Sequence, residues 1–193
     1  MIPTYLDNLQ LPQLFVAFTN TVDKYIHEST TDEYIVDSEK KQVSGFVTEH
    51  FGQNEKASGK YFTVENPSGS PYALLQIDHG IVKSKEIKKC DCAIANESTL
   101  CFIEFKTNAC SDNPLRIDNN YQIAIEQLTT TIGLFDSYHT SQGTDFRTIR
   151  TVEAFICFRQ GYPRSTASQM NYRDNFATDN RIPLLFERNK QLS

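Results

Sequence analysis

The chain has 193 residues and a net charge of -5, with 39% hydrophobic and 22% charged residues. This composition is typical of a globular domain and excludes disordered and fibrous classes. No run of 18 or more apolar residues occurs, and residues 1–9 lack the basic flank and apolar run of a signal peptide. We therefore expect one domain over residues 1–193, located in the cytoplasm and without a membrane partner.

Charge is unevenly distributed along the chain. Residues 1–82 hold five lysines, no arginine and eleven acidic residues, whereas residues 83–193 carry a net charge of +1. Residues 147–193 carry +4, and Lys83, Lys85, Lys88 and Lys89 form a second basic cluster. Such clusters either hold phosphate groups, even on an acidic protein, or are solvated faces.

Helical spacing of apolar residues predicts two helices in the first quarter of the chain. The first runs from Leu11 to about Ser29, with Pro12 suited to a first helical turn. The second covers residues 38–51 and ends at Gly52. We expect residues 1–37 to form a helical addition before the core.

From Lys60 the apolar pattern changes to that of strands. Strands are predicted at 61–65, 72–82, 88–95 and 100–107, with turns at 66–71 and 96–99. A helix follows over 121–139, with Asp118 or Asn119 as its cap, and then a buried central strand over 151–158. This order predicts an α/β fold with a mixed sheet. Residues 159–193 are expected to form an irregular C-terminal extension.

The five cysteines do not have the spacing of a disulfide framework, and their number is odd. We expect reduced thiols. Cys90, Cys92, Cys101 and Cys110 are also compatible with a zinc site, although the usual Cys-x2-4-Cys pairs are missing. The alternative is that they serve as small buried apolar residues.

Asp91, Glu104 and Lys106 lie at the ends of two predicted strands. If these strands pair as a hairpin around residues 96–99, Asp91 and Glu104 are directly opposed and Lys106 lies on the same face. Two carboxylates about 5 Å apart repel by about 3 kcal/mol at an effective dielectric of about 20. The pattern therefore predicts bound Mg²⁺ or Mn²⁺, with Lys106 beside a metal-bound water. The alternative is a salt bridge on a solvated sheet face, worth under about 1 kcal/mol.

The motif Asp91-x12-Glu104-Phe105-Lys106, with helix and strand before it and helix and strand after it, resembles the PD-(D/E)xK nuclease superfamily. The similarity covers about residues 38–158. It implies a restriction-endonuclease-like core in which Asp91, Glu104 and the Phe105 carbonyl ligate Mg²⁺, while Lys106 positions the attacking water. It also implies an endo- or exonuclease that cuts DNA or, less often, RNA, in defence or DNA processing. Cys90 replaces the proline that names the family, which is not a ligand.

Other polar residues are candidates to complete this site. Many family members add a glutamate from a helix before the sheet, for which Glu49 and Glu28 are the candidates. The remaining candidates are the pair Asp78 and His79 on the preceding strand, and Gln122, Glu126 and Gln127 on the following helix. A turn residue and an exposed helix face are the respective alternatives. The four histidines are scattered, so a Ser or Cys hydrolase is not indicated.

The resemblance implies nucleic acid as the partner, with DNA favoured over RNA. The sequence shows no separate DNA-binding module, and the first half of the chain is acidic. Specificity is therefore expected to come from a protein partner, from a homodimer or from loops. Two other interpretations stay open. One is a catalytically inactive nuclease-fold protein that acts as a binding or assembly module, and the other is an unrelated α/β domain whose three charged residues form a surface salt bridge.

Overall fold

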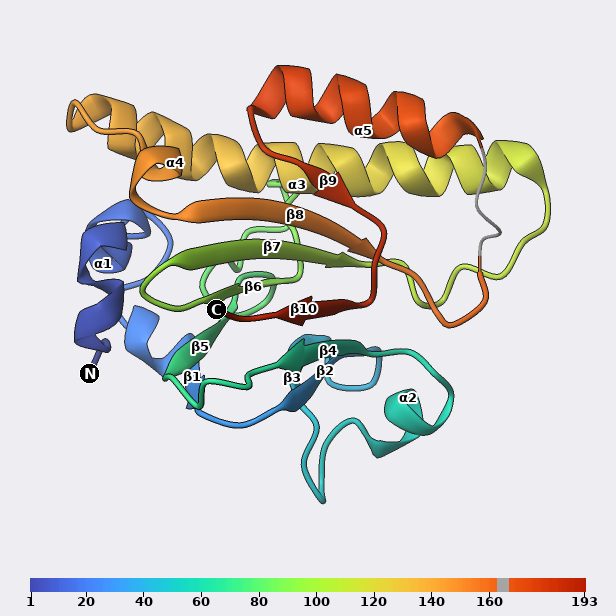
Figure 1. Cartoon of the computed structure of the whole chain (residues 1–193), viewed down its shortest axis with the longest axis horizontal. Helices are drawn as coiled ribbons and strands as arrows, with labels where there is room; N and C mark the ends of the chain where they lie inside the picture. Colours follow the sequence, from blue (N-terminus) through green and yellow to red (C-terminus); the bar gives the residue numbers. More distant parts are fainter. Residues whose placement is uncertain (163–166) are drawn as a thin grey trace.

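The computed structural model describes residues 1–162 and 167–193. Two β-sheets pack face to face, and helices cover the outer face of the larger sheet (Figure 1). The larger sheet has the strand order β1-β5-β6-β7-β8-β9, and the smaller sheet has the order β10-β4-β2-β3. The predicted α/β architecture with a mixed sheet flanked by helices is confirmed at this level.

The elements have the following bounds. The strands are β1 (Ile26–Ser29), β2 (Glu33–Ser38), β3 (Val43–Phe46), β4 (Phe62–Glu65), β5 (Tyr72–Gln76), β6 (Cys92–Ala95), β7 (Thr99–Phe105), β8 (Thr151–Cys157), β9 (Leu184–Leu185) and β10 (Asn189–Gln191). The α-helices are α1 (Leu11–Leu14), α2 (Gln53–Ala57), α3 (Pro114–Ser141), α4 (Phe146–Ile149) and α5 (Ala167–Asn180). Two 3-10 helices, η1 (Thr4–Leu9) and η2 (Val22–Tyr25), lie near the N-terminus.

The centre of the larger sheet is an antiparallel meander of β5, β6 and β7, followed by β8 parallel to β7. A parallel pair needs a long crossover, which the 28-residue helix α3 supplies. The turn between β6 and β7 closes through Asn96, whose side-chain oxygen accepts hydrogen bonds from the backbone N–H groups of Ser98 and Thr99. These contacts confirm the predicted hairpin around residues 96–99.

Two apolar cores lie on opposite faces of the larger sheet. On the α3 face, Phe135 packs against Phe102 and Phe15 with ring centroids 5.1 and 5.6 Å apart. Between the sheets, Phe62 of β4 packs against Phe155 of β8 at 5.1 Å. The larger sheet is therefore buried on both faces over its central strands, which explains why β6 and β7 contain almost unbroken apolar runs.

Both predicted N-terminal helices are wrong over most of their length. Only Leu11–Leu14 of the first is α-helical, and its last part is strand β1, in which Ile26 pairs with Leu75. The 38–51 segment contains strand β3, because pairing with β2 satisfies its backbone while Gly45 admits the Phe51 ring. Residues 1–37 are accordingly not a helical addition.

Further differences concern the remaining segments. The 61–65 strand is confirmed as β4 but belongs to the smaller sheet, not to the meander.

The helix expected over 121–139 begins at Pro114 and is capped by Asn113 rather than by Asp118 or Asn119. The Asn113 side chain accepts a hydrogen bond from the Leu115 N–H. The supposedly irregular extension contains α5, which packs on α3 through the stacked rings of Tyr172 and Tyr121. Residues 163–166 of that extension lie outside the described residues.

No helix in the described part of the chain, residues 1–162 and 167–193, is long and apolar enough to cross a membrane. The longest, α3, buries one face against the larger sheet.

Candidate functional site

The strand register sets Asp91 opposite Glu104. The β6–β7 pairs run from Cys92 with Ile103 to Ala95 with Leu100, and continuing this register by one position beyond β6 sets Asp91 opposite Glu104. The Phe105 N–H donates to Asp91 Oδ2 at 2.6 Å, which fixes the Asp91 carboxylate against the end of β7. The predicted pairing of the two carboxylates is confirmed.

Both carboxylates are buried. Asp91 is 9% exposed and Glu104 only 1% exposed, and Glu104 lies on the face that α3 covers. The Lys106–Glu104 salt bridge considered from the sequence is present, but the expectation that it lies on a solvated face is wrong, because Glu104 is out of water. A pair of like charges in such a position costs free energy unless a cation or a proton compensates it.

Lys106 stands beside this pair and is held from two sides. Its Nζ donates to Glu104 Oε1 at 2.5 Å and to Gln127 Oε1 of α3 at 2.7 Å. Gln127 is itself oriented, because its Nε2 donates to the Lys89 carbonyl at 3.0 Å. The ammonium thus has a fixed position at the boundary between the sheet and α3, with 17% of the side chain exposed.

Burial dominates the ionisation of the two carboxyls. Burial raises the pKa of Asp91 well above its ordinary value, and the charges of Glu104 and Asp37 raise it further, against the Phe105 N–H and Lys106. Burial also raises the pKa of Glu104 to about 7, although the charge of Lys106 lowers it. A proton or a cation beside the two buried carboxyls would relieve the free-energy cost of ionising both.

The donor set fits a hard divalent cation. Glu104 Oε2 is buried and has no hydrogen-bond donor among the described residues, so one carboxylate oxygen is left for a ligand. The described residues contain no group of three or more His, Cys, Asp or Glu side chains arranged to hold a metal ion. Two carboxylates supplemented by waters are sufficient for Mg²⁺, which dehydrates reluctantly.

The zinc alternative is wrong. Cys92 and Cys101 face the core between the sheets, whereas Cys90 faces the α3 side and Cys110 is exposed. All five cysteines are free thiols. Burial raises the pKa of Cys90, Cys92 and Cys101 well above the ordinary value, which disfavours the thiolate that zinc needs.

Comparison of the chain with protein-family models, with curated proteins and with solved structures gave no match. Function must therefore be inferred from the chemistry of the site.

The structure brings some of the other candidates to the site. Asp78 and His79 lie in the turn after β5, where the Asp78 N–H donates to the Asp91 carbonyl at 3.1 Å. The Asp78 carboxylate pairs with Lys89 at 3.0 Å. Both interpretations of Asp78, turn residue and site neighbour, therefore hold. Gln127 reaches the site through Lys106, as described above.

The other candidates lie away from it. Glu28 is on the edge strand β1 and accepts a hydrogen bond from the Tyr5 hydroxyl, and Glu49 is in an exposed turn rather than on a helix. On the exposed side of α3, Gln122 bonds to Asp118 and Glu126 pairs with Lys88. Neither expected helix glutamate completes the site.

Asp37 of β2 is the residue that the sequence did not indicate. The Ser44 hydroxyl donates to its carboxylate at 3.4 Å, and its charge raises the pKa values of both Asp91 and Glu104. The available signal was the strand-forming run Tyr34-Ile35-Val36 that leads into Asp37, but the helix predicted directly after it concealed the β2–β3 pair.

A basic hollow adjoins the site. Its volume is about 400 Å³, and it is lined by Asp78, His79, Lys85, Ile87, Lys88, Lys89, Ile123 and Gln127. Gln127 connects it directly to Lys106. The lysine cluster noted in the sequence therefore lies beside the paired carboxylates rather than on a remote face.

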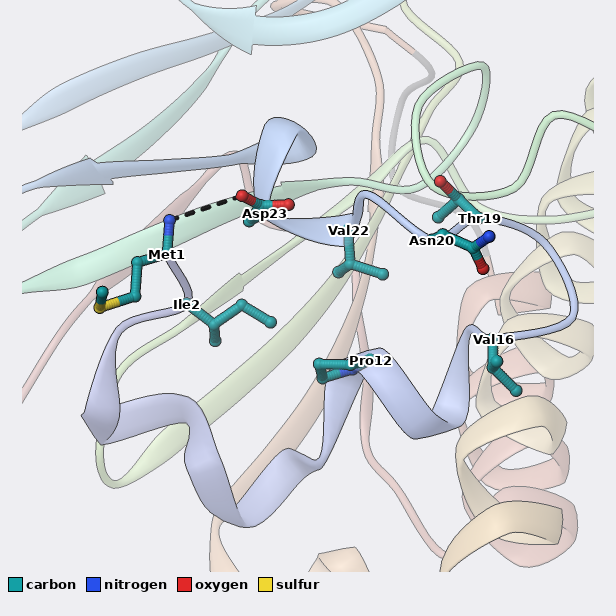
Figure 2. Close-up of a pocket in the computed structure, with 8 residues that line it drawn as sticks. All are labelled: Met1, Ile2, Pro12, Val16, Thr19, Asn20, Val22 and Asp23. Atoms are coloured by element: carbon teal, nitrogen blue, oxygen red, sulfur yellow. Dashed lines mark ion pairs between the residues drawn. The ribbon is translucent and has the colours of Figure 1, made fainter.

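A second hollow, of about 320 Å³, lies at the N-terminal segment, and its lining differs chemically from that of the carboxylate site (Figure 2). Most of the eight side chains drawn there are apolar or uncharged, and Asp23 is the one carboxylate among them. Asp23 is paired with the Met1 amino group at 3.5 Å. This hollow offers no pair of acidic groups comparable to Asp91 and Glu104.

Proposed function

We propose that the protein is a Mg²⁺-dependent nuclease that hydrolyses phosphodiester bonds of nucleic acid, DNA in preference to RNA. The observation that carries the proposal is the buried Asp91–Glu104 pair, in which Glu104 Oε2 has no donor while Lys106 stands beside Oε1. Ionising two neighbouring carboxyls out of water costs free energy, because each loses its hydration and repels the other. A bound cation offsets this cost.

Each residue has a definite role in this proposal. Asp91 and Glu104 hold the cation, together with the Phe105 carbonyl and waters. The cation, when bound, supplies Lewis-acid stabilisation of the phosphate and lowers the pKa of a bound water. Lys106 orients that water and stabilises the negative charge that develops on the phosphate, and Gln127 holds the ammonium in place.

Two features support nucleic acid as the substrate. The hollow beside Lys106 carries the exposed side chains of Lys85 and Lys88, which suit the phosphates of a strand entering the site. Lys88 is paired with Glu126, and Lys89 is buried and paired with Asp78. The central elements also follow one another as three antiparallel strands, a helix and a parallel strand, with the acidic and basic residues at the positions of the PD-(D/E)xK resemblance.

A cleavage assay tests this proposal. Purified protein is incubated with supercoiled plasmid, single-stranded DNA and RNA in Mg²⁺, Mn²⁺ or EDTA, beside the variants Glu104→Gln and Glu187→Gln. Glu187 is an exposed carboxylate paired with Arg173, so its variant controls for loss of one acid elsewhere. We expect metal-dependent cleavage by the wild type and the control, and none by Glu104→Gln. Cleavage that persists both in EDTA and in Glu104→Gln refutes the mechanism.

One observation favours a second candidate, a nuclease-fold binding module without activity. Lys106 already neutralises Glu104 through a direct ion pair, and the described residues contain no group of three His, Cys, Asp or Glu side chains that could hold a metal. This candidate predicts that DNA is retarded in a gel-shift assay with Mg²⁺ but remains uncut. Binding without cleavage in either metal would therefore favour the module over the enzyme.

A further inference from the structure

Strand β2 directs Asp37 toward the larger sheet. Alternate residues of a strand share a face, so Asp37 lies on the same face as Ile35. Ile35 is fully buried in the core between the two sheets. Asp37 therefore extends this row by one position, toward the end of the interface.

A chain of contacts brings the end of β2, which carries Asp37, toward the start of β6, which follows Asp91. Asp37 pairs with Ser44 across β2 and β3, and the Ser44 carbonyl accepts from Gln76 Nε2 of β5 at 2.7 Å. Gln76 in turn pairs with Cys92, the residue that follows Asp91. The smaller sheet is thus fixed to the larger one at the start of β6, where the two buried carboxylates lie.

The electrostatic environment agrees with this placement. The charge of Asp37 raises the pKa values of Asp91 and Glu104, and burial raises that of Asp37 itself, while Lys106 lowers it. Three carboxylates, from β2, from the residue before β6 and from β7, are therefore linked electrostatically, and the charge of Lys106 lowers the pKa of all three. Glu104 Oε2, buried and without a donor, is an independent sign that this environment accommodates a cation.

We propose, on the basis of the proposed function, that Asp37 is the third carboxylate of the cation site and holds a water bound to the metal. The role is assigned through a water because the described residues include no group of three His, Cys, Asp or Glu side chains that could hold one ion directly. Asp37 is thus a positioning residue, contributed by a strand of the smaller sheet, where the sequence led us to expect a helix glutamate. Carboxylates that orient metal-bound groups typically change metal affinity 10- to 100-fold when removed.

Mn²⁺ affinity, measured by isothermal titration calorimetry and by electron paramagnetic resonance, tests this role without requiring activity. The proteins compared are the wild type, Asp37→Asn, Asp37→Glu, Glu104→Gln and Asp174→Asn. Asp174 is an exposed acid on α5 and serves as the matched control. We expect Asp37→Asn to weaken Mn²⁺ binding about 10- to 100-fold, Asp37→Glu to restore part of it, and Asp174→Asn to bind as the wild type.

Thermal unfolding without metal separates this effect from misfolding. Asp37→Asn removes a negative charge from beside two others, so the metal-free variant should unfold at the same temperature as the wild type or higher. Wild-type affinity in Asp37→Asn, combined with loss of binding in Glu104→Gln, overturns the role of Asp37 and leaves the proposed function standing. A wild type that binds no Mn²⁺ overturns both. A lower unfolding temperature of metal-free Asp37→Asn, with no recovery of affinity in Asp37→Glu, assigns Asp37 a purely structural role and also overturns the proposal.

Discussion

Removal of the Lys106 ammonium tests whether its contact with Glu104 is a buried ion pair. Lys106→Met keeps most of the apolar stem and removes the charge. At the observed 2.5 Å the attraction is about 7 kcal/mol at an effective dielectric of about 20, and desolvation of both groups offsets more than half of it. Glu104 is 1% exposed, so little screening by water reduces the remainder. We expect a coupling free energy of about 2–3 kcal/mol.

A double-mutant cycle in urea measures this coupling. The free energy of unfolding is determined at pH 8 in EDTA for the wild type, Lys106→Met, Glu104→Gln and the double variant. Lys106→Met should lose about 3 kcal/mol, since it leaves a buried carboxylate without its ammonium, and the double variant should lose much less. The exposed pair of Lys88 and Glu126, at 2.6 Å, is the matched control and should give under about 1 kcal/mol. An equally small coupling for Lys106 and Glu104 would refute the reasoning.

Three further predictions concern the scaffold. Gly80→Ala should destabilise the protein by about 1–3 kcal/mol in urea, because the added Cβ would lie 2.3 Å from the Gln76 carbonyl oxygen; unchanged stability would contradict this close approach. Phe135→Ala should cost about 3–5 kcal/mol and Phe135→Leu clearly less, because the ring is fully buried among other aromatic rings. Burial lowers the pKa of His139, so the unfolded state binds its proton more readily and stability should fall as pH decreases through about 6.5. The unfolding temperature of His139→Gln should fall less steeply between pH 7 and 5, and equal slopes would contradict this assignment.

The sequence was informative where local signals and the tertiary structure agree. Asn96 closes a turn that strand-forming runs flank on both sides, so the spacing of Asp91 and Glu104 was enough to predict their pairing. The 121–139 segment was recognised as helix for the same reason, since its apolar residues repeat at the helical period and pack on the larger sheet. Its true start escaped prediction because Asn113 and Pro114 precede the first strongly apolar turn.

Prediction failed where packing overrides periodicity. Of the apolar residues between Leu11 and Ile26, Leu11, Leu14, Phe15 and Val22 are buried and Val16 is exposed. Part of the segment is 3-10 helix and extended backbone rather than α-helix, because β1 pairs with β5. The helix α5 was missed for the opposite reason. It is mostly polar, and Phe176 is its one fully buried large side chain in the described part. Its sequence therefore lacks the apolar stripe from which an amphipathic helix is predicted.

Asp37 shows why a site can include residues that lie outside the sequence motif. Asp91, Glu104 and Lys106 belong to one hairpin, so their proximity depends on local register alone. Asp37 influences their ionisation from a different sheet, which is joined to β5 through the contact of Gln76 with the Ser44 carbonyl, a contact that no spacing in the sequence encodes. The smaller sheet must therefore be docked before the carboxylate cluster is complete. Any cation that needs this cluster binds the docked state alone and stabilises the contact between the two sheets by mass action.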